Sequence, residues 1–244
     1  MKHVILAPLL LLLAAFSPAG EIDALIEADR LEEAFRLAQK RTAAGDADAA
    51  EALGWFYDEG RFVAHDPSQA VRYYRMAAEG GDARAQWRLG VMLDQGEGLS
   101  PDPEQALRWF EKAAAQDYEE ALTSLGVMHA GGHGTRRDYR KAMHYYLKAA
   151  RAGSAHGFYG VGALHGNGEG VKRNPVESVA WILVALSLGD EAVREHLHEE
   201  ALSAKQKARA LERAKAIASQ FGHAAEKVAY PVDVPAAEAA AETA

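Results

Sequence analysis

Apolar positions return at a fixed interval of 36 residues along most of this chain. One apolar column is made of Leu53, Leu89, Leu125 and Val161, and a second follows three residues later at Phe56, Met92, Met128 and Leu164. A spacing of three places both columns on one face of a helix, so we expect them to form the core. A fixed period of this length is typical of stacked supersecondary units that pack only on their neighbours.

Polar residues and glycines divide each period into helix, turn and helix. A left-handed glycine such as Gly96 ends the first helix. A side-chain acceptor and a proline then open the second helix, at Asp66-Pro67, Asp102-Pro103 and Asn174-Pro175, and Asp138 holds the same place in the remaining repeat. Three residues after those caps stand Gln69, Gln105 and Glu177, which we expect to complete capping boxes by bonding the cap's own amide.

Glycine also recurs inside the first helix of every period, at Gly54, Gly90, Gly126 and Gly162. An interior glycine costs a helix about 1 kcal/mol relative to alanine, so its return indicates that another helix approaches too closely for a side chain. Small residues recur on the second helices at Ala77, Ala113, Ala149 and Ala185. We expect these alanines to be the partners of the glycines.

The frame defines five segments of the chain. Residues 1–19 read as a signal peptide, 20–45 as a single capping helix of half a repeat, and 46–189 as four repeats divided at 81, 117 and 153. Residues 190–222 then begin a fifth first helix and close the stack with an amphipathic helix that Ser203 and Gln206 open by a capping box. The remaining residues, 223–244, have too little apolar variety to pack and are expected to be disordered.

The first residues predict export. Lys2 precedes an apolar run from Val4 to Phe16, and small residues follow it up to Ala19. The alternative is a membrane anchor, but this run is shorter than the roughly 20 residues that span a bilayer. We therefore expect cleavage near Ala19 and a periplasmic or secreted protein without membrane insertion. The chain has no cysteine, which argues against a lipid anchor and excludes disulfides and thiolate metal sites.

Composition and motifs limit the chemistry that the chain can perform. Its net charge of −8 disfavours nucleic acid as a partner. The sequence contains no GxSxG, HExxH or P-loop motif. His129 and His165 stand one period apart and His133 follows one turn after His129, so the three could converge on a metal. Because Tyr57 and Leu93 occupy the same column as His129 and His165, we expect packing instead, with no metal and no cofactor.

The repeats resemble a known family. The runs AQWRLGVMLDQGEGLSPDPEQALRWFEKAAAQ and YGVGALHGNGEGVKRNPVESVAWILVALSLGD are similar to Sel-one-like repeats, relatives of the tetratricopeptide repeat, and the likeness covers about residues 31 to 190. This sequence departs from the pattern at Arg61-Phe62, Asp117 and Ser178. The resemblance implies an all-α, right-handed α/α solenoid superhelix that scaffolds protein complexes, often in bacterial envelopes. Some cysteine-rich members are linked to β-lactam hydrolysis.

The face of each first helix opposite the core columns changes identity from repeat to repeat. It carries aromatics and charges of both signs, at Glu51, Trp55, Asp58, Arg84, Trp87, Arg88, Asp94, Glu120, His156 and Tyr159. Aromatic residues and arginine dominate binding hot spots, so we expect these residues to line a concave groove that holds a protein or peptide. The alternative is a solvated face with incidental aromatics.

The function expected from the sequence is an exported interaction scaffold of the bacterial cell envelope, without catalysis. One alternative is an envelope hydrolase acting on cell-wall or β-lactam substrates. That activity needs a nucleophile beside a base, and neither Ser124 nor Ser154 has a sequence context of that kind. Another alternative is a regulator that restrains a sensor protein, which would use the same binding surface.

Overall fold

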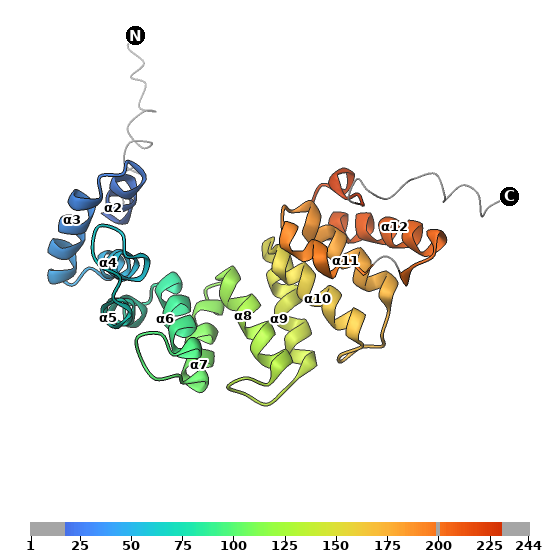
Figure 1. The fold of residues 1–244 in the computed structure, drawn as a ribbon, viewed down its shortest axis with the longest axis horizontal. Helices are drawn as coiled ribbons and strands as arrows, with labels where there is room; N and C mark the ends of the chain where they lie inside the picture. Colours follow the sequence, from blue (N-terminus) through green and yellow to red (C-terminus); the bar gives the residue numbers. More distant parts are fainter. Residues whose placement is uncertain (1–17, 199–200, 231–244) are drawn as a thin grey trace, which may run out of the picture. The chain divides into compact units, whose positions relative to one another are not determined.

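The computed structural model describes residues 18–198 and 201–230, and Figure 1 shows their order along the chain. These residues form helices joined by turns, and no strand occurs among them, so the all-α prediction is confirmed. The signal peptide predicted at 1–19 lies outside the described residues except for its end, because the first described helix begins at Pro18. The chain divides into two compact units, an N-terminal unit ending at Ala113 and a C-terminal unit beginning at Ala114.

The N-terminal unit is a stack of antiparallel helix pairs. Its helices are α2 (Pro18–Glu27), α3 (Leu31–Ala43), α4 (Ala47–Glu59), α5 (Pro67–Glu79), α6 (Ala83–Gln95) and α7 (Pro103–Ala114), which reaches the boundary of the unit. Helices α2 to α5 each pack on the next helix of the chain, and α2 also contacts α4. Gly90 of α6 lies against the ring of Phe110 on α7. The two predicted apolar columns are buried here, with Leu53, Leu89, Phe56 and Met92 all 2% exposed or less.

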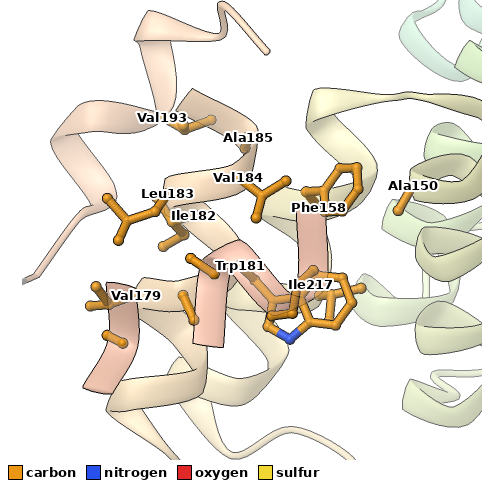
Figure 2. Close-up of a cluster of buried hydrophobic side chains, with 14 of the residues drawn as sticks. Ala150, Phe158, Val179, Trp181, Ile182, Leu183, Val184, Ala185, Val193 and Ile217 are labelled. Carbon is orange, nitrogen blue, oxygen red and sulfur yellow. The ribbon is translucent and has the colours of Figure 1, made fainter. Parts of the chain in front are cut away.

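The C-terminal unit is also built from consecutive packed helices and ends in a capping helix. Its elements are α8 (Glu119–Gly131), α9 (Tyr139–Ala152), α10 (Ala155–Asn167), α11 (Pro175–Ser187), the 3-10 helix η2 (Glu191–His196), α12 (Ala204–Gln220) and the 3-10 helix η4 (Ala225–Lys227). Figure 2 shows a core cluster of this unit, around Trp181. The Trp181 ring lies 5.7 Å from that of Phe158 and 5.5 Å from that of Phe221, so α12 and the turn after it cover the last repeat.

The N-terminal cap is a helix pair, so the prediction of one helix over this segment is wrong. The chain turns between α2 and α3 at Asp29, whose φ of 55° is left-handed. Ile22 on α2 is 2% exposed within the cluster that also contains Phe35 and Phe56. Helix α2 therefore takes the place of a first helix beside α4, and α3 takes that of a second helix.

The C-terminal cap also differs from the prediction. The expected fifth first helix is only the six-residue η2, whereas the final amphipathic helix and its capping box at Ser203 and Gln206 are confirmed. Residues 223–230 are packed and not disordered. Val228 is 2% exposed, and the Tyr230 hydroxyl donates to the carbonyl oxygen of Lys207 at 3.0 Å. The rest of the predicted tail, 231–244, lies outside the described residues.

Capping of the second helices is confirmed at Asp66, Asp102, Asp138 and Asn174, whose side chains accept backbone amides of the first turn. The capping boxes expected at Gln69, Gln105 and Glu177 do not form. In each case the amide of the cap already donates to a carbonyl near the end of the preceding helix. These bonds join Asp66 to Tyr57 at 2.9 Å, Asp102 to Leu93 at 2.7 Å and Asn174 to His165 at 2.8 Å. This bond closes the loop between the two helices of each repeat, and it is independent of the side chain because a backbone carbonyl accepts it.

The interior glycines are sites of close approach, as predicted, but their partners are not the alanines. A Cβ on Gly54, Gly90 or Gly126 would lie 2.4 to 2.6 Å from the ring of Tyr74, Phe110 or Tyr146, respectively. At Gly162 the nearest atoms belong to Ile182 and Ser178. The glycines therefore leave room for a large side chain of the second helix, while the alanines are buried elsewhere on that helix.

Candidate functional site

Seven of the ten predicted binding residues lie in the N-terminal unit. Glu51, Trp55 and Asp58 are spaced by four and three residues on α4, which places them on one helix face. The other four are on α6, at Arg84, Trp87, Arg88 and Asp94. We call the first six of these residues, without Asp94, the α4–α6 row.

Acids on α4 pair with arginines on α6 along this row. Arg84 Nη2 donates to Glu51 Oε2 at 2.8 Å, and Arg88 Nη1 lies 3.9 Å from Asp58 Oδ2. Asp58 also accepts a hydrogen bond of 3.0 Å from the hydroxyl of Tyr74, the residue that packs on Gly54. The row therefore links two consecutive repeats by charge, on a surface outside the repeated apolar columns.

Aromatic rings alternate with these charges. Trp55 is half-buried and packs edge-on against Phe56, with ring centroids 5.1 Å apart. The guanidinium carbon of Arg88 lies 5.0 Å from the Trp87 ring, and that of Arg61 lies 5.6 Å from the Trp55 ring. Cations this close to an indole face are attracted by its quadrupole. Both tryptophans keep part of their surface open to a partner.

Glu51 departs from the prediction of an exposed variable face, because it is only 5% exposed. Burial raises the pKa of Glu51 to about 7, since a charged carboxylate is poorly solvated there. The charges of Asp82 and Asp23 raise this pKa further, whereas Arg84 lowers it. The sequence did not reveal this burial because it depends on α2, a helix that the period does not predict.

A cavity opens at Glu51, and sequence reasoning missed most of its other residues. It consists of two adjoining cavities of about 220 and 340 Å³ between α2, α4 and the start of α6. We call it the Glu51 cavity; its lining residues are Ile22, Asp23, Ile26, Glu27, Asp48, Glu51, Ala52, Trp55, Asp82 and Arg84. Asp82 is recognisable in the sequence only as a helix cap, and Asp23 only as a residue of the N-terminal helix.

The three predicted binding residues of the C-terminal unit are not joined in a comparable row. Glu120 on α8 is exposed. His156 on α10 is also exposed, with Nε2 3.8 Å from Asp190 Oδ2. Tyr159 is half-buried, and its ring centroid lies 5.1 Å from that of His196 on η2. The positions that correspond to Trp87 and Arg88 are Thr123 and Ser124 in the next repeat.

A second cavity, of about 290 Å³, lies in the C-terminal unit where η2 stands in place of a full first helix. Val179 and Ile182 of α11 supply part of its apolar lining, and Arg173, His196 and His198 supply cationic or titratable groups. Tyr159 is the one predicted binding residue that reaches this cavity. The short η2 explains its presence, because a regular helix would continue the stack over α10 and α11.

The histidines considered as metal ligands occupy different environments. His129 is 2% exposed and stacks on Tyr145 with ring centroids 5.5 Å apart and planes 2° apart. His133 is exposed, and His165 is partly buried, which lowers the pKa of its imidazole. Within 18–198 and 201–230 no group of three His, Asp or Glu side chains is placed to hold a metal. None of the helices described there is both long enough and apolar enough to span a membrane.

Comparison with known families and structures agrees with this repeat geometry. The Sel1 repeat model matches residues 47–82, 83–118, 119–154 and 158–190. The crystal structure of a Sel1 repeat protein from Oxalobacter formigenes is 28% identical, with a TM-score of 0.69 over 84% of this chain and 85% of that protein. No curated protein matches the sequence.

Two further crystal structures share the helical arrangement. One is c5321, a protective antigen of uropathogenic Escherichia coli with an SLR fold, which is 29% identical with a TM-score of 0.64. The match covers 80% of this chain but only 46% of that antigen. The other is the immunity protein Pa5087 from Pseudomonas aeruginosa, at 17% identity and a TM-score of 0.52 over 88% and 89% of the two chains, a likeness of fold alone.

Proposed function

Because this chain belongs to the Sel1 repeat family, whose members are generally protein–protein interaction scaffolds, we propose that it is an exported scaffold for a protein or peptide partner. In this proposal the partner binds the groove face formed by the first helices, with the α4–α6 row as its main contact. The protein acts by holding its partner and performs no reaction.

The observation that carries the proposal is the α4–α6 row itself. Its residues combine two tryptophans and two arginines with two acids, while the equivalent positions of the later repeats hold residues such as Thr123, Ser124 and Gly160. The stack therefore does not require either Trp87 or Arg88. Partly exposed tryptophan and arginine side chains are the residue types that contribute most to protein binding.

Export is proposed from the sequence alone, from Lys2 and the apolar run Val4–Phe16. Cell fractionation and N-terminal sequencing of a C-terminally tagged chain would test it. We expect an envelope fraction whose first residue is near Gly20. A cytoplasmic protein that retains Met1 would contradict export without affecting the binding proposal.

The two serines considered as hydrolase nucleophiles both make hydrogen bonds within helices. The Ser154 hydroxyl accepts the amide of Gly157 at 3.3 Å as the cap of α10, and the Ser124 hydroxyl donates to the carbonyl of Glu120 at 2.8 Å. Both are ordinary helix contacts. A regulator that restrains a sensor remains a version of the scaffold proposal, because it differs only in the identity of the partner.

The test is a double substitution, Trp87→Ala with Arg88→Ala, in an affinity capture from envelope extracts analysed by mass spectrometry. Loss of a hot spot should weaken a captured complex by about 2 kcal/mol, which is roughly 30-fold. The matched control is Trp109→Ala with Lys112→Ala on the second helix α7, where Lys112 Nζ lies 3.7 Å from the centre of the Trp109 ring. That pair is also a cation beside an indole ring, but it lies on a second helix and outside the α4–α6 row.

The two double variants separate the possible outcomes. We expect the α6 variant to lose its partner and the α7 variant to keep it. The opposite result would place the partner on the second helices and would overturn the proposed face. Thermal unfolding of both variants must be compared, because early melting of the α6 variant would show that Trp87 is needed for packing.

A further inference from the structure

The Glu51 cavity contains more negative charge than its own arginine can neutralise. Five carboxylates line it, at Asp23, Glu27, Asp48, Glu51 and Asp82, and Arg84 is the one cationic side chain among its lining residues. Like charges gathered in one cavity repel each other, and a cation that enters it offsets this repulsion. The balance of charge therefore favours a positively charged occupant.

Glu51 gives this cavity a defined point of attachment. Its side chain is 7% exposed, and only Oε2 is bonded, to Arg84 at 2.8 Å. The other oxygen, Oε1, accepts no hydrogen bond from any described residue, and Glu51 lines both parts of the cavity. Oε1 is not one of the fully buried side-chain atoms that lack a hydrogen bond among the described residues, so it is open to the cavity. An open carboxylate oxygen at the base of a cavity is thus an acceptor available to a donor from outside.

The walls suit a long side chain with a charged end. Ile22, Ile26 and Trp55 give apolar surface beside the acids. Lysine and arginine place their methylene stems on such surface while the charged group reaches polar partners, and an indole face adds attraction for the cation. We propose that the Glu51 cavity receives a lysine or arginine side chain of the protein partner, whose charged group binds the Glu51 carboxylate. This inference rests on the proposed scaffold function.

A metal ion fits the same cavity less well. Divalent cations such as Ca²⁺ need six or more oxygen ligands, and the guanidinium of Arg84 is a fixed positive charge next to the central carboxylate. Among the described residues, no three acid or histidine side chains are placed to share a metal ion. A basic side chain carries one positive charge instead of two, so Arg84 repels it less, and it needs only one or two carboxylates.

The repeat frame shows that the stack does not need the carboxylate of Glu51. The column of Glu51 holds Trp87, Thr123 and Tyr159 in the other repeats. The raised pKa of Glu51 agrees with this, because burial makes the ionised carboxylate costly in the unbound protein. Binding a cation favours the ionised form, so the affinity should fall as the pH drops below about 7.

That pH dependence involves every charged group that faces Glu51. Asp23 and Glu27 come from α2, Asp48 from α4, and Asp82 and Arg84 from the start of α6. The hydroxyl of Tyr74 on α5 also interacts electrostatically with Glu51. Burial raises the pKa of this tyrosine far above its ordinary value, so Tyr74 stays neutral between pH 6 and pH 8. Glu51 is the group in this set whose raised pKa lies near neutrality.

The experiment titrates the full mature chain with N-acetyl-lysine methylamide at pH 8 and follows the Trp55 indole signal by NMR, assigned with a Trp55→Phe variant. N-acetyl-norleucine methylamide at the same ionic strength is the uncharged control, and N-acetyl-arginine methylamide is the second cationic probe. We expect both cationic probes to shift the Trp55 signal in a saturable way and the norleucine probe to leave it unchanged.

Three variants locate the binding group. Glu51→Gln should weaken the lysine probe at least about tenfold, and Asp23→Asn, on the exposed rim, should weaken it less. Glu59→Gln is the matched control, because Glu59 is an exposed acid at the end of the same helix and does not line the cavity. We expect this control to bind like the wild type, and the wild type to bind more weakly at pH 6 than at pH 8.

Four results would overturn the inference. These are equal shifts with the norleucine probe, no saturable shift with any probe, unchanged binding by Glu51→Gln, or displacement of the lysine probe by micromolar Ca²⁺, which would identify a metal site. The scaffold proposal is tested separately by capture with the Trp87 and Arg88 variant. If Glu51→Gln still captures the partner, the proposed role of the Glu51 cavity is refuted and the scaffold proposal stands. If the probe binds but no partner is captured, the cavity binds cations and the scaffold proposal is refuted.

Discussion

The two units of this protein have cores of the same kind, but the exposed faces of their first helices differ. In both, an apolar column is buried and an aromatic ring packs on an interior glycine, as Tyr74 does on Gly54 and Tyr146 on Gly126. In the N-terminal unit the face is charged and cross-linked by ion pairs between α4 and α6. In the C-terminal unit the corresponding positions include Thr123, Gly160 and Ala163.

This difference separates the residues that make the fold from those that give it a function. Positions that repeat in both units are fixed by packing, since a change at any of them disturbs a neighbouring helix. Positions that differ are free of that requirement, and in the N-terminal unit they hold a buried acid and half-buried tryptophans. Substitutions at shared and at differing positions should therefore have effects of different size.

The largest effect is expected at a shared position, Gly126→Leu on α8. The Tyr146 ring leaves no room even for a Cβ, which would lie 2.4 Å from it. Overpacking of this kind costs typically about 1 to 3 kcal/mol, and contact with a ring held by the second helix puts the cost at the upper end. Denaturant unfolding should show a destabilisation of about 3 kcal/mol.

The control for this change is Gly131→Leu at the end of the same helix, where a Cβ would meet no atom within 4 Å. Its effect on the unfolding free energy should stay below about 1 kcal/mol. Gly90→Leu, against Phe110, should resemble Gly126→Leu and show that both units share this contact. Equal stability of all three variants would mean that the ring contact does not constrain the repeat.

The next effect has the opposite sign, because Glu51→Gln should stabilise the protein at pH 8. The folded-state pKa of Glu51 is raised to about 7, so its contribution to stability is complete below its unfolded pKa of 4.5 and is lost as the pH rises through about 7. Glutamine carries no charge and escapes this loss. We expect a gain of about 1 to 3 kcal/mol at pH 8 and little gain at pH 4.

Glu120→Gln provides the comparison in the C-terminal unit. Glu120 is an exposed acid on the equivalent face, so this substitution should change stability by no more than about 0.5 kcal/mol at either pH. Denaturant midpoints measured at both pH values would test the pair. A loss of stability in Glu51→Gln at pH 8 would show that the ion pair with Arg84 outweighs the cost of burying the carboxylate.

A smaller effect is expected from removing one hydroxyl in each unit. The Tyr74 hydroxyl donates to Asp58 at 3.0 Å, whereas the Tyr146 hydroxyl bonds to none of the described residues. Tyr74→Phe should therefore cost about 1 kcal/mol, and Tyr146→Phe should be close to neutral. Phe110 already occupies this column in the repeat between them. Equal costs for the two variants would show that the bond to Asp58 adds nothing to stability.

The sequence predicts the shared features well because they repeat. The 36-residue period identifies the helices, the caps and the buried columns before any coordinates are known. The Glu51 cavity depends instead on α2, which lies beside α4 because the chain turns at Asp29. The repeat pattern does not predict that turn. The capping boxes failed for a similar reason, because the cap amides at Asp66, Asp102 and Asn174 bond to the preceding helices.

The smallest expected effect is that of metal removal, and it tests whether the histidines of the C-terminal unit belong to its packing. His129 is a buried ring stacked on Tyr145, while His133 is exposed on the following loop. Tyr57 and Leu93 fill the column of His129 in the N-terminal unit, which shows that the stack accepts a side chain without a ligand atom for zinc. Dialysis against a chelator should therefore leave the melting temperature unchanged. A loss of several degrees that zinc restores, and that His129→Leu abolishes, would identify a metal site in one unit that the other lacks.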